Sequence, residues 1–164
     1  MTPAARFLAA AAVVLWGAGL GRDAFDAWVD GTVLPPIAAE TSVEVLDRNG
    51  DLLRAYTVAE GRWRMATTAA TTDAVYLAML VRYEDQRFYR HHGVDGYALL
   101  RAGWQALWAG RVVSGGSTLT MQAARLLEDT GTGRWSGKIR QIRVALALER
   151  QYSKDDILGI YLDR

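Results

Sequence analysis

The chain has 164 residues, of which 51% are hydrophobic, and it carries no cysteine and a formal net charge of +1. This length and apolar content suit one folded domain with a core and exclude a disordered chain. The absence of cysteine excludes disulfides and cysteine-ligated metal. Residues 82–164 hold thirteen basic and nine acidic side chains, so we expect an anionic partner to bind the C-terminal half.

The N-terminal region is predicted to be a membrane segment. Residues 7–20 carry no charge, and Arg6 precedes them. This pattern is typical of a membrane anchor with a cytoplasmic start or of a cleaved signal peptide, and both alternatives stand. We assign residues 1–22 to this segment and residues 23–42, which include Pro35-Pro36, to a linker. Either alternative places the remaining residues outside the cytoplasm.

One hairpin and a series of helices are predicted after the linker. Apolar alternation on both sides of Asn49-Gly50 indicates a β-hairpin. Capping residues and apolar periodicity then predict helices from the Asp73 cap to about Tyr89, from Gly96 to Ala109, from about Thr118 to Leu127, from Arg134 to Arg150, and after a Ser153 cap. Trp104 and Trp108 are expected in the core, with a sugar-stacking surface as the alternative.

Glu84 is the candidate catalytic residue. On a helix that runs to Tyr89, Glu84 shares one face with the apolar or aromatic residues Leu77, Leu80, Phe88 and His91. A carboxylate on such a stripe loses water, and this desolvation raises its pKa. The carboxylate can then accept a proton near neutral pH. The alternative is a surface acid held in a salt bridge.

Two later stretches suit an anion. Gly115-Gly116-Ser117-Thr118 opens a helix, where exposed backbone N–H groups and the helix dipole favour negative charge. Basic residues between Arg134 and Arg150 could hold a phosphate. An ordinary capped helix and a solvated basic face are the alternatives.

Four motifs, in order, resemble those of glycosyltransferase family 51, the peptidoglycan glycosyltransferases of bifunctional penicillin-binding proteins. The motif E-D-x-x-F-x-x-H-x-G is similar to residues 84–93, and G-G-S-T-x-T-Q-Q resembles residues 115–122, with Met121 replacing the first glutamine. R-K-x-x-E followed by A-x-x-L-E resembles residues 137–149, and K-x-x-I-L-x-x-Y-L-N resembles residues 154–163. The resemblance covers about residues 43–164 and is strongest to the penicillin-binding protein 1C class.

The resemblance implies a mainly α, lysozyme-like glycosyltransferase domain over residues 43–164, behind a short hairpin and a membrane segment. It implies an inner-membrane, single-pass enzyme whose extracytoplasmic domain polymerises lipid II and the growing glycan strand into β-1,4 glycan, releasing undecaprenyl pyrophosphate. Cell-wall synthesis proteins are expected partners, and nucleic acid is not. Glu84 would be the general base, and the implied substrate-binding residues are Asp85, Phe88, His91, Gly116, Ser117, Thr118, Gln122, Lys138, Arg140, Gln141 and Lys154.

Three departures accompany the resemblance. Gln141 replaces the glutamate of the third motif, and an amide cannot carry negative charge. The fifth family motif and a transpeptidase domain would lie beyond residue 164, so we expect an N-terminal part of a longer protein with an incomplete glycosyltransferase domain. No ligand cluster demands a metal, although magnesium could neutralise pyrophosphate charge. A lysozyme-like muramidase and a non-catalytic, anchored lipid II- or partner-binding module are the alternative functions.

Overall fold

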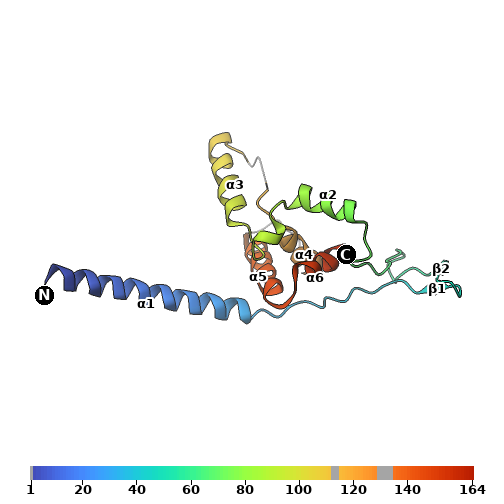
Figure 1. Cartoon of the computed structure of the whole chain (residues 1–164), viewed down its shortest axis with the longest axis horizontal. Helices are drawn as coiled ribbons and strands as arrows, with labels where there is room; N and C mark the ends of the chain where they lie inside the picture. Colours follow the sequence, from blue (N-terminus) through green and yellow to red (C-terminus); the bar gives the residue numbers. More distant parts are fainter. Residues whose placement is uncertain (1, 112–114, 129–134) are drawn as a thin grey trace. The chain divides into compact units, whose positions relative to one another are not determined.

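The computed structural model describes residues 2–111, 115–128 and 135–164, and it is mainly helical, as predicted (Figure 1). The described residues form six α-helices, one 3-10 helix and one two-stranded hairpin, in agreement with the predicted lysozyme-like helical domain. The chain divides into two compact units, residues 1–33 and residues 34–164.

The first unit is one long apolar helix, α1 (Pro3–Asp30). Its 28 residues span about 42 Å at about 1.5 Å per residue, which exceeds the roughly 30 Å of a bilayer's hydrocarbon core. An 18-residue window has a mean hydropathy of 1.6, so α1 is long and apolar enough to cross a membrane. The helix continues through residues 23–30, which the sequence assigns to a linker, and an ion pair one turn apart joins Arg22 and Asp26 at 3.6 Å there.

The second unit begins with the predicted hairpin of β1 (Glu44–Leu46) and β2 (Leu52–Ala55), which pair antiparallel. The connecting loop is held by Asp47, whose Oδ1 accepts the backbone N–H groups of Asn49 at 2.7 Å and Asp51 at 2.9 Å. These backbone hydrogen bonds, led by that from Asp51, lower the pKa of Asp47. Nearly every strand residue is exposed, so the hairpin contributes little to the core.

Three predicted caps begin helices in the structure. Asp73 precedes α2 (Ala74–Glu84), Asp95 precedes α3 (Gly96–Ala109), and Ser153 precedes α6 (Lys154–Leu162). In each case a side-chain oxygen accepts a backbone N–H of the first turn, which has no partner inside the helix. Gly110, with φ of +63°, ends α3 where predicted.

The first large helix is shorter than predicted. α2 ends at Glu84, because Asp85 leaves the helical conformation with φ of −157°, and the 3-10 helix η1 (Phe88–Arg90) follows. The prediction of one helix to Tyr89 is therefore wrong. Glu84 does not share a helical face with Phe88 and His91, and its side chain is exposed rather than buried on a core-facing stripe.

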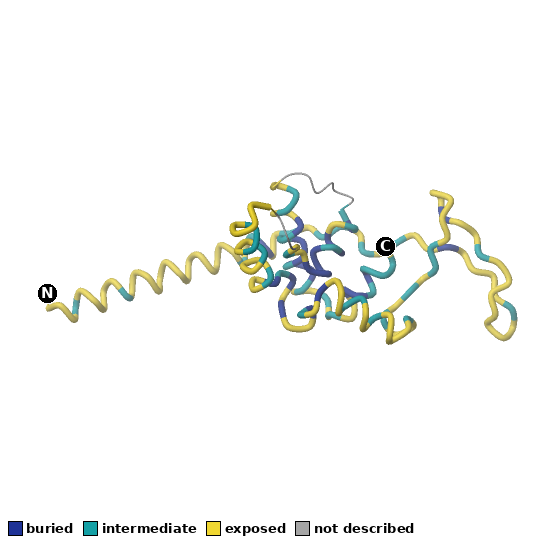
Figure 2. Tube along the Cα trace, turned by 90° about the horizontal axis from the view of Figure 1, so that it is seen from above, coloured by how far each residue is buried: buried dark blue, intermediate teal, exposed yellow. Residues whose placement is uncertain are grey.

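The core of the second unit is built by α4 (Leu119–Glu128), α5 (Trp135–Gln151) and α6. α4 packs against both α5 and α6, and the three helices lie together in Figure 1. Figure 2 shows the buried residues concentrated in this part of the unit. The core side chains are those of Phe88, Leu119, Met121, Ala123, Ala124, Leu127, Val144, Ala145, Leu148, Ile157, Leu158 and Ile160.

α3 lies outside this core, and none of its residues is buried. Trp104 and Trp108 are 64% and 76% exposed, and their ring centroids are 5.8 Å apart. The prediction that both tryptophans pack in the core is wrong. Helical spacing by itself does not reveal whether an apolar face meets the rest of the chain.

Candidate active site

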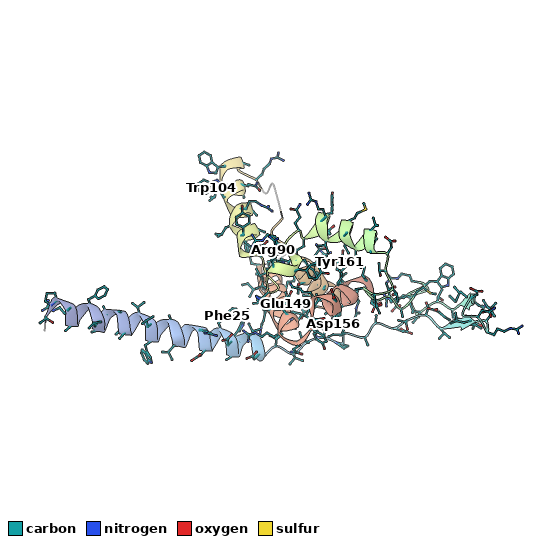
Figure 3. The ribbon with its side chains drawn as sticks, in the orientation of Figure 1. Phe25, Arg90, Trp104, Glu149, Asp156 and Tyr161 are labelled. Carbon is teal, nitrogen blue, oxygen red and sulfur yellow. The ribbon has the colours of Figure 1, made fainter. Side chains whose placement is uncertain are left out.

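The first and second motifs meet at Glu84. This residue closes α2, and its Oε2 accepts a hydrogen bond of 2.9 Å from Nε2 of Gln122 on α4. Tyr161 of α6 interacts with the same carboxylate: burial raises the pKa of Tyr161, and the negative charge of Glu84 raises it further. Figure 3 shows Tyr161 close to the helices of the core. Three helices thus surround one exposed carboxylate.

Asp85, the neighbour of Glu84, is buried rather than facing solvent. Its buried carboxylate lies 2.9 Å from Nε2 of His91 and accepts the backbone N–H of Leu119, the first residue of α4, at 3.0 Å. These contacts tie the end of α2 and η1 to the start of α4. Asp85 also lines a pocket beside Glu84, but both of its strong contacts are internal.

We expect Asp85→Ala to destabilise the fold by about 3 kcal/mol, because it leaves the Leu119 N–H and the His91 ring without their buried acceptor. Asp85→Asn should lose less, since its amide oxygen can still accept one of these hydrogen bonds. Urea denaturation measures both. Asp51→Ala, at an exposed aspartate of the hairpin, is the control. Equal losses for Asp85→Ala and Asp51→Ala would show that these buried hydrogen bonds do not stabilise the fold.

The glycine and hydroxyl residues of the second motif approach the first motif closely. Thr118 is buried, and its Oγ1 donates to the carbonyl of Gly93 at 2.6 Å and accepts the N–H of Met121 at 3.1 Å. A Cβ on Gly116 would lie 2.6 Å from Cδ2 of Leu99 and 3.3 Å from its Cα, so a larger residue there would require Leu99 to shift. Ser117 is exposed and accepts from Nζ of Lys138 at 2.7 Å.

Lys154 is engaged inside the protein. Its Nζ lies 2.6 Å from Oε1 of Glu149 and 4.5 Å from the centroid of the Phe88 ring, and the same Glu149 oxygen accepts from Oγ1 of Thr120 at 2.6 Å. Glu149 is labelled among the core helices in Figure 3. The structure therefore places Lys154 and Phe88 in a packing network, in contact with Glu149 and with each other.

Two of the pockets are lined by residues of the first three motifs. The first, which we call the Glu84 pocket, has a volume of about 230 Å³ and is lined by Tyr83, Glu84, Asp85, Gln86, Arg87, Asp95, Tyr97, Ala98, Arg101, Gly115, Ser117 and Thr118. The second, which we call the Lys138 pocket, has a volume of about 300 Å³ and is lined by Ser117, Met121, Gln122, Arg125, Lys138 and Gln141. Ser117 lines both, and Gln122 links the second pocket to Glu84.

The pockets include arginines that were not predicted from the sequence. Arg125 lines the Lys138 pocket, whereas the predicted Arg140 is exposed and pairs through Nε with Oε1 of Glu128 at 2.6 Å. Arg125 lies three residues after Gln122 on α4, so helical spacing from that motif glutamine could have found it. Arg87 and Arg101 line the Glu84 pocket, and no defined motif position marks them.

Comparison with known proteins agrees with this arrangement. The transglycosylase family model matches residues 49–164, a range that includes both pockets and all four motifs. The chain belongs to the transglycosylase family. The family resemblance noted from the four motifs is therefore confirmed, while the roles of individual residues stay predictions.

Relatives of this transglycosylase chain are penicillin-binding proteins. It is 43% identical to penicillin-binding protein 1C of Escherichia coli over 96% of this chain and 20% of that protein. It is 42% identical to penicillin-binding protein 1A of Pseudomonas aeruginosa over 54% of this chain and 11% of that protein. It is 30% identical to penicillin-binding protein 1A of Escherichia coli over 82% of this chain and 16% of that protein. The chain thus spans a fifth or less of these relatives.

The transglycosylase chain should lose anion binding at a lower pH than an ordinary lysine site would. Burial lowers the pKa of Lys138, and the positive charge of Arg125 lowers it further. Affinity for inorganic pyrophosphate should therefore fall as pH rises toward the ordinary lysine value of about 10.4, beginning below it. Lys138→Arg should keep the charge and shift the decline upward. A titration with the same midpoint in both proteins would contradict this assignment.

Proposed function

We propose that this chain is a peptidoglycan glycosyltransferase that polymerises lipid II into β-1,4 glycan and releases undecaprenyl pyrophosphate. Family membership and the penicillin-binding relatives support the reaction class. The observation that carries the proposal is the hydrogen bond of 2.9 Å between Gln122 Nε2 and Glu84 Oε2. Because Gln122 lines the Lys138 pocket, this bond places the carboxylate of the Glu84 pocket beside the basic side chains of the Lys138 pocket.

Glu84 is suited to the general base in this reaction. Its exposed carboxylate lines the Glu84 pocket, which we assign to the acceptor. There it takes the proton from the 4-hydroxyl of the acceptor N-acetylglucosamine as that oxygen attacks the anomeric carbon of the donor. Hydrogen bonding to Gln122 fixes the direction of the carboxylate. Among the described residues no hydrogen bond to the other oxygen of Glu84 is found, so that oxygen can face the substrate hydroxyl.

The Lys138 pocket is suited to the leaving group. As the new glycosidic bond forms with inversion, the bond between the anomeric carbon and the lipid pyrophosphate breaks, and both electrons leave with the pyrophosphate oxygen. Lys138 and Arg125 line this pocket and would stabilise that developing negative charge. Ser117 lines both pockets and holds Lys138 in place through their hydrogen bond of 2.7 Å.

A lipid substrate and a membrane location fit the exposed apolar surfaces. α1 is long and apolar enough to cross a membrane, which supports a membrane anchor. Following the family resemblance, we assign the anchor to the inner membrane and the glycosyltransferase domain to its extracytoplasmic side. α3 presents a set of exposed apolar and aromatic side chains that water disfavours. Its members are Tyr97, Leu100, Trp104, Leu107 and Trp108. We assign this surface to the acyl region of the bilayer or the prenyl chain of the substrate. Cell-wall synthesis proteins are proposed as further partners.

Incubation of the full chain with labelled lipid II in detergent tests the proposal. Products longer than the starting disaccharide support a transferase. Shortening of preformed glycan without elongation would support a muramidase instead, because water would then be the acceptor. Binding of lipid II without either product would favour the non-catalytic, anchored module.

A further inference from the structure

The charge of the Lys138 pocket is unusual for a site that would handle a metal-bound diphosphate. Among the described residues that line it, Lys138 and Arg125 are the cationic side chains, and the four others are neutral. Within the described part of the chain, neither cation forms an ion pair with a carboxylate. Lys138 instead donates a hydrogen bond to the neutral hydroxyl of Ser117. Both positive charges are therefore available to an anion.

Gln141 lines this pocket with an unsatisfied hydrogen-bond donor. The residue is only 3% exposed, and its Nε2 finds no acceptor among the described residues. Buried donors without an acceptor are rare in folded proteins. The terminal amide torsion of glutamine is broad, so a small rotation can turn this N–H toward an oxygen in the pocket. An anionic oxygen would satisfy it.

The resemblance to family 51 places a glutamate where this chain has Gln141. A carboxylate at this position would add one negative charge to a pocket that holds two positive ones. It would compete with the substrate for Lys138 and Arg125, and it would offer oxygen to a divalent cation. The amide does neither.

The residues of this pocket do not fit the magnesium that the resemblance allows. Magnesium in phosphate sites is usually held by one or two carboxylates together with the phosphate oxygens, and no carboxylate is among the described residues that line the Lys138 pocket. Across the part of the chain that the structure describes, no three histidine, aspartate or glutamate side chains form a group that could hold a metal ion. Two neighbouring cations would also repel a third.

We propose that the Lys138 pocket binds the diphosphate of the lipid-linked donor directly, without a divalent cation, and that Gln141 determines this preference by donating a hydrogen bond and excluding negative charge. The identity of the donor rests on the proposed function. The recognised chemistry, a free diphosphate anion, is testable without turnover.

Calorimetric titration of the detergent-solubilised full chain with inorganic pyrophosphate tests this inference, once in EDTA and once in excess magnesium. The unsubstituted chain should bind in EDTA and bind more weakly in magnesium, because the magnesium complex carries less negative charge. Gln141→Glu should bind about tenfold more weakly in EDTA, and magnesium should strengthen its binding. The two proteins are thus expected to respond to magnesium with opposite sign.

Two further variants separate charge from folding. Gln151→Glu adds the same charge to an exposed position of the same helix and should behave as the unsubstituted chain. Gln141→Met keeps the pocket neutral but removes the amide, so it should bind more weakly in EDTA and gain no response to magnesium. Circular dichroism of each variant reports whether α5 and its neighbours remain folded.

Several results would overturn the inference. One is that the unsubstituted chain binds pyrophosphate only when magnesium is present, and another is that it does not bind pyrophosphate in either condition. A third such result is that Gln141→Glu binds pyrophosphate in EDTA as tightly as the unsubstituted chain does. Failure of the glycosyltransferase proposal is distinguishable from these results. In that case lipid II is not elongated, although pyrophosphate still binds with the predicted magnesium response.

Discussion

Glu84→Gln is expected to reduce polymerisation of lipid II by a factor of about 100 to 10,000, the range for loss of a general acid or base. The amide is nearly the same size, but it cannot take the proton from the acceptor hydroxyl. Its oxygen can still accept the hydrogen bond from Gln122 Nε2, and the side chain at this position is exposed. The fold should therefore be unaffected.

The rate is measured as initial incorporation of labelled lipid II into glycan, and folding by thermal denaturation followed by circular dichroism. Glu60→Gln, which removes the same charge from another exposed glutamate, serves as the matched control and should keep the normal rate. A rate for Glu84→Gln close to that of the control would remove Glu84 from the role of base. A lower thermal stability of Glu84→Gln than of Glu60→Gln would point to a structural effect instead.

Helix boundaries set by neighbouring residues were predictable from the sequence. Asp73, Asp95 and Ser153 each bond backbone groups two or three positions away, and Gly110 ends α3 by its own backbone conformation. Such interactions depend on local sequence alone. The same is true of the hairpin, whose loop is held by Asp47 and its near neighbours.

The end of α2 was not predictable in this way. Asp85 leaves the helix to reach His91, six positions away, and the N–H of Leu119, thirty-four positions away. The local apolar pattern favoured a continuing helix, and these tertiary hydrogen bonds override it. As a result the sequence identified Glu84 but attributed its role to burial. In the structure it is an exposed carboxylate oriented by a hydrogen bond from Gln122.

The basic residues illustrate the same limit. A cluster of positive charge near the third motif was evident, but which member faces the pocket depends on partners elsewhere. Glu128 engages Arg140 at 2.6 Å, while Arg125, on a different helix, lines the pocket with Lys138. The exposure of Trp104 and Trp108 likewise depends on which elements pack on α3.

Gly93 joins the first motif to the core through a close backbone contact. Its φ is +83°, and a Cβ there would lie 2.8 Å from the carbonyl oxygen of Ala145 and 3.2 Å from Cγ of Glu149. Its own carbonyl accepts the hydrogen bond from Thr118. The nearer of these atoms belongs to the backbone of α5, which cannot shift without disturbing the core.

Gly93→Ala is therefore expected to lower the free energy of unfolding by about 3 to 5 kcal/mol, combining left-handed backbone strain with overpacking. Gly50→Ala is the matched control, because Gly50 has φ of +90° but a Cβ there would meet no atom within 4 Å. It should lose only about 1 to 2 kcal/mol, the strain alone. Denaturant unfolding of both variants gives the difference. Similar losses would show that the contact between Gly93 and α5 does not matter. A much larger loss for Gly93→Ala, with a parallel loss of polymerisation, would mean that this contact holds the first motif, residues 84–93, against the core.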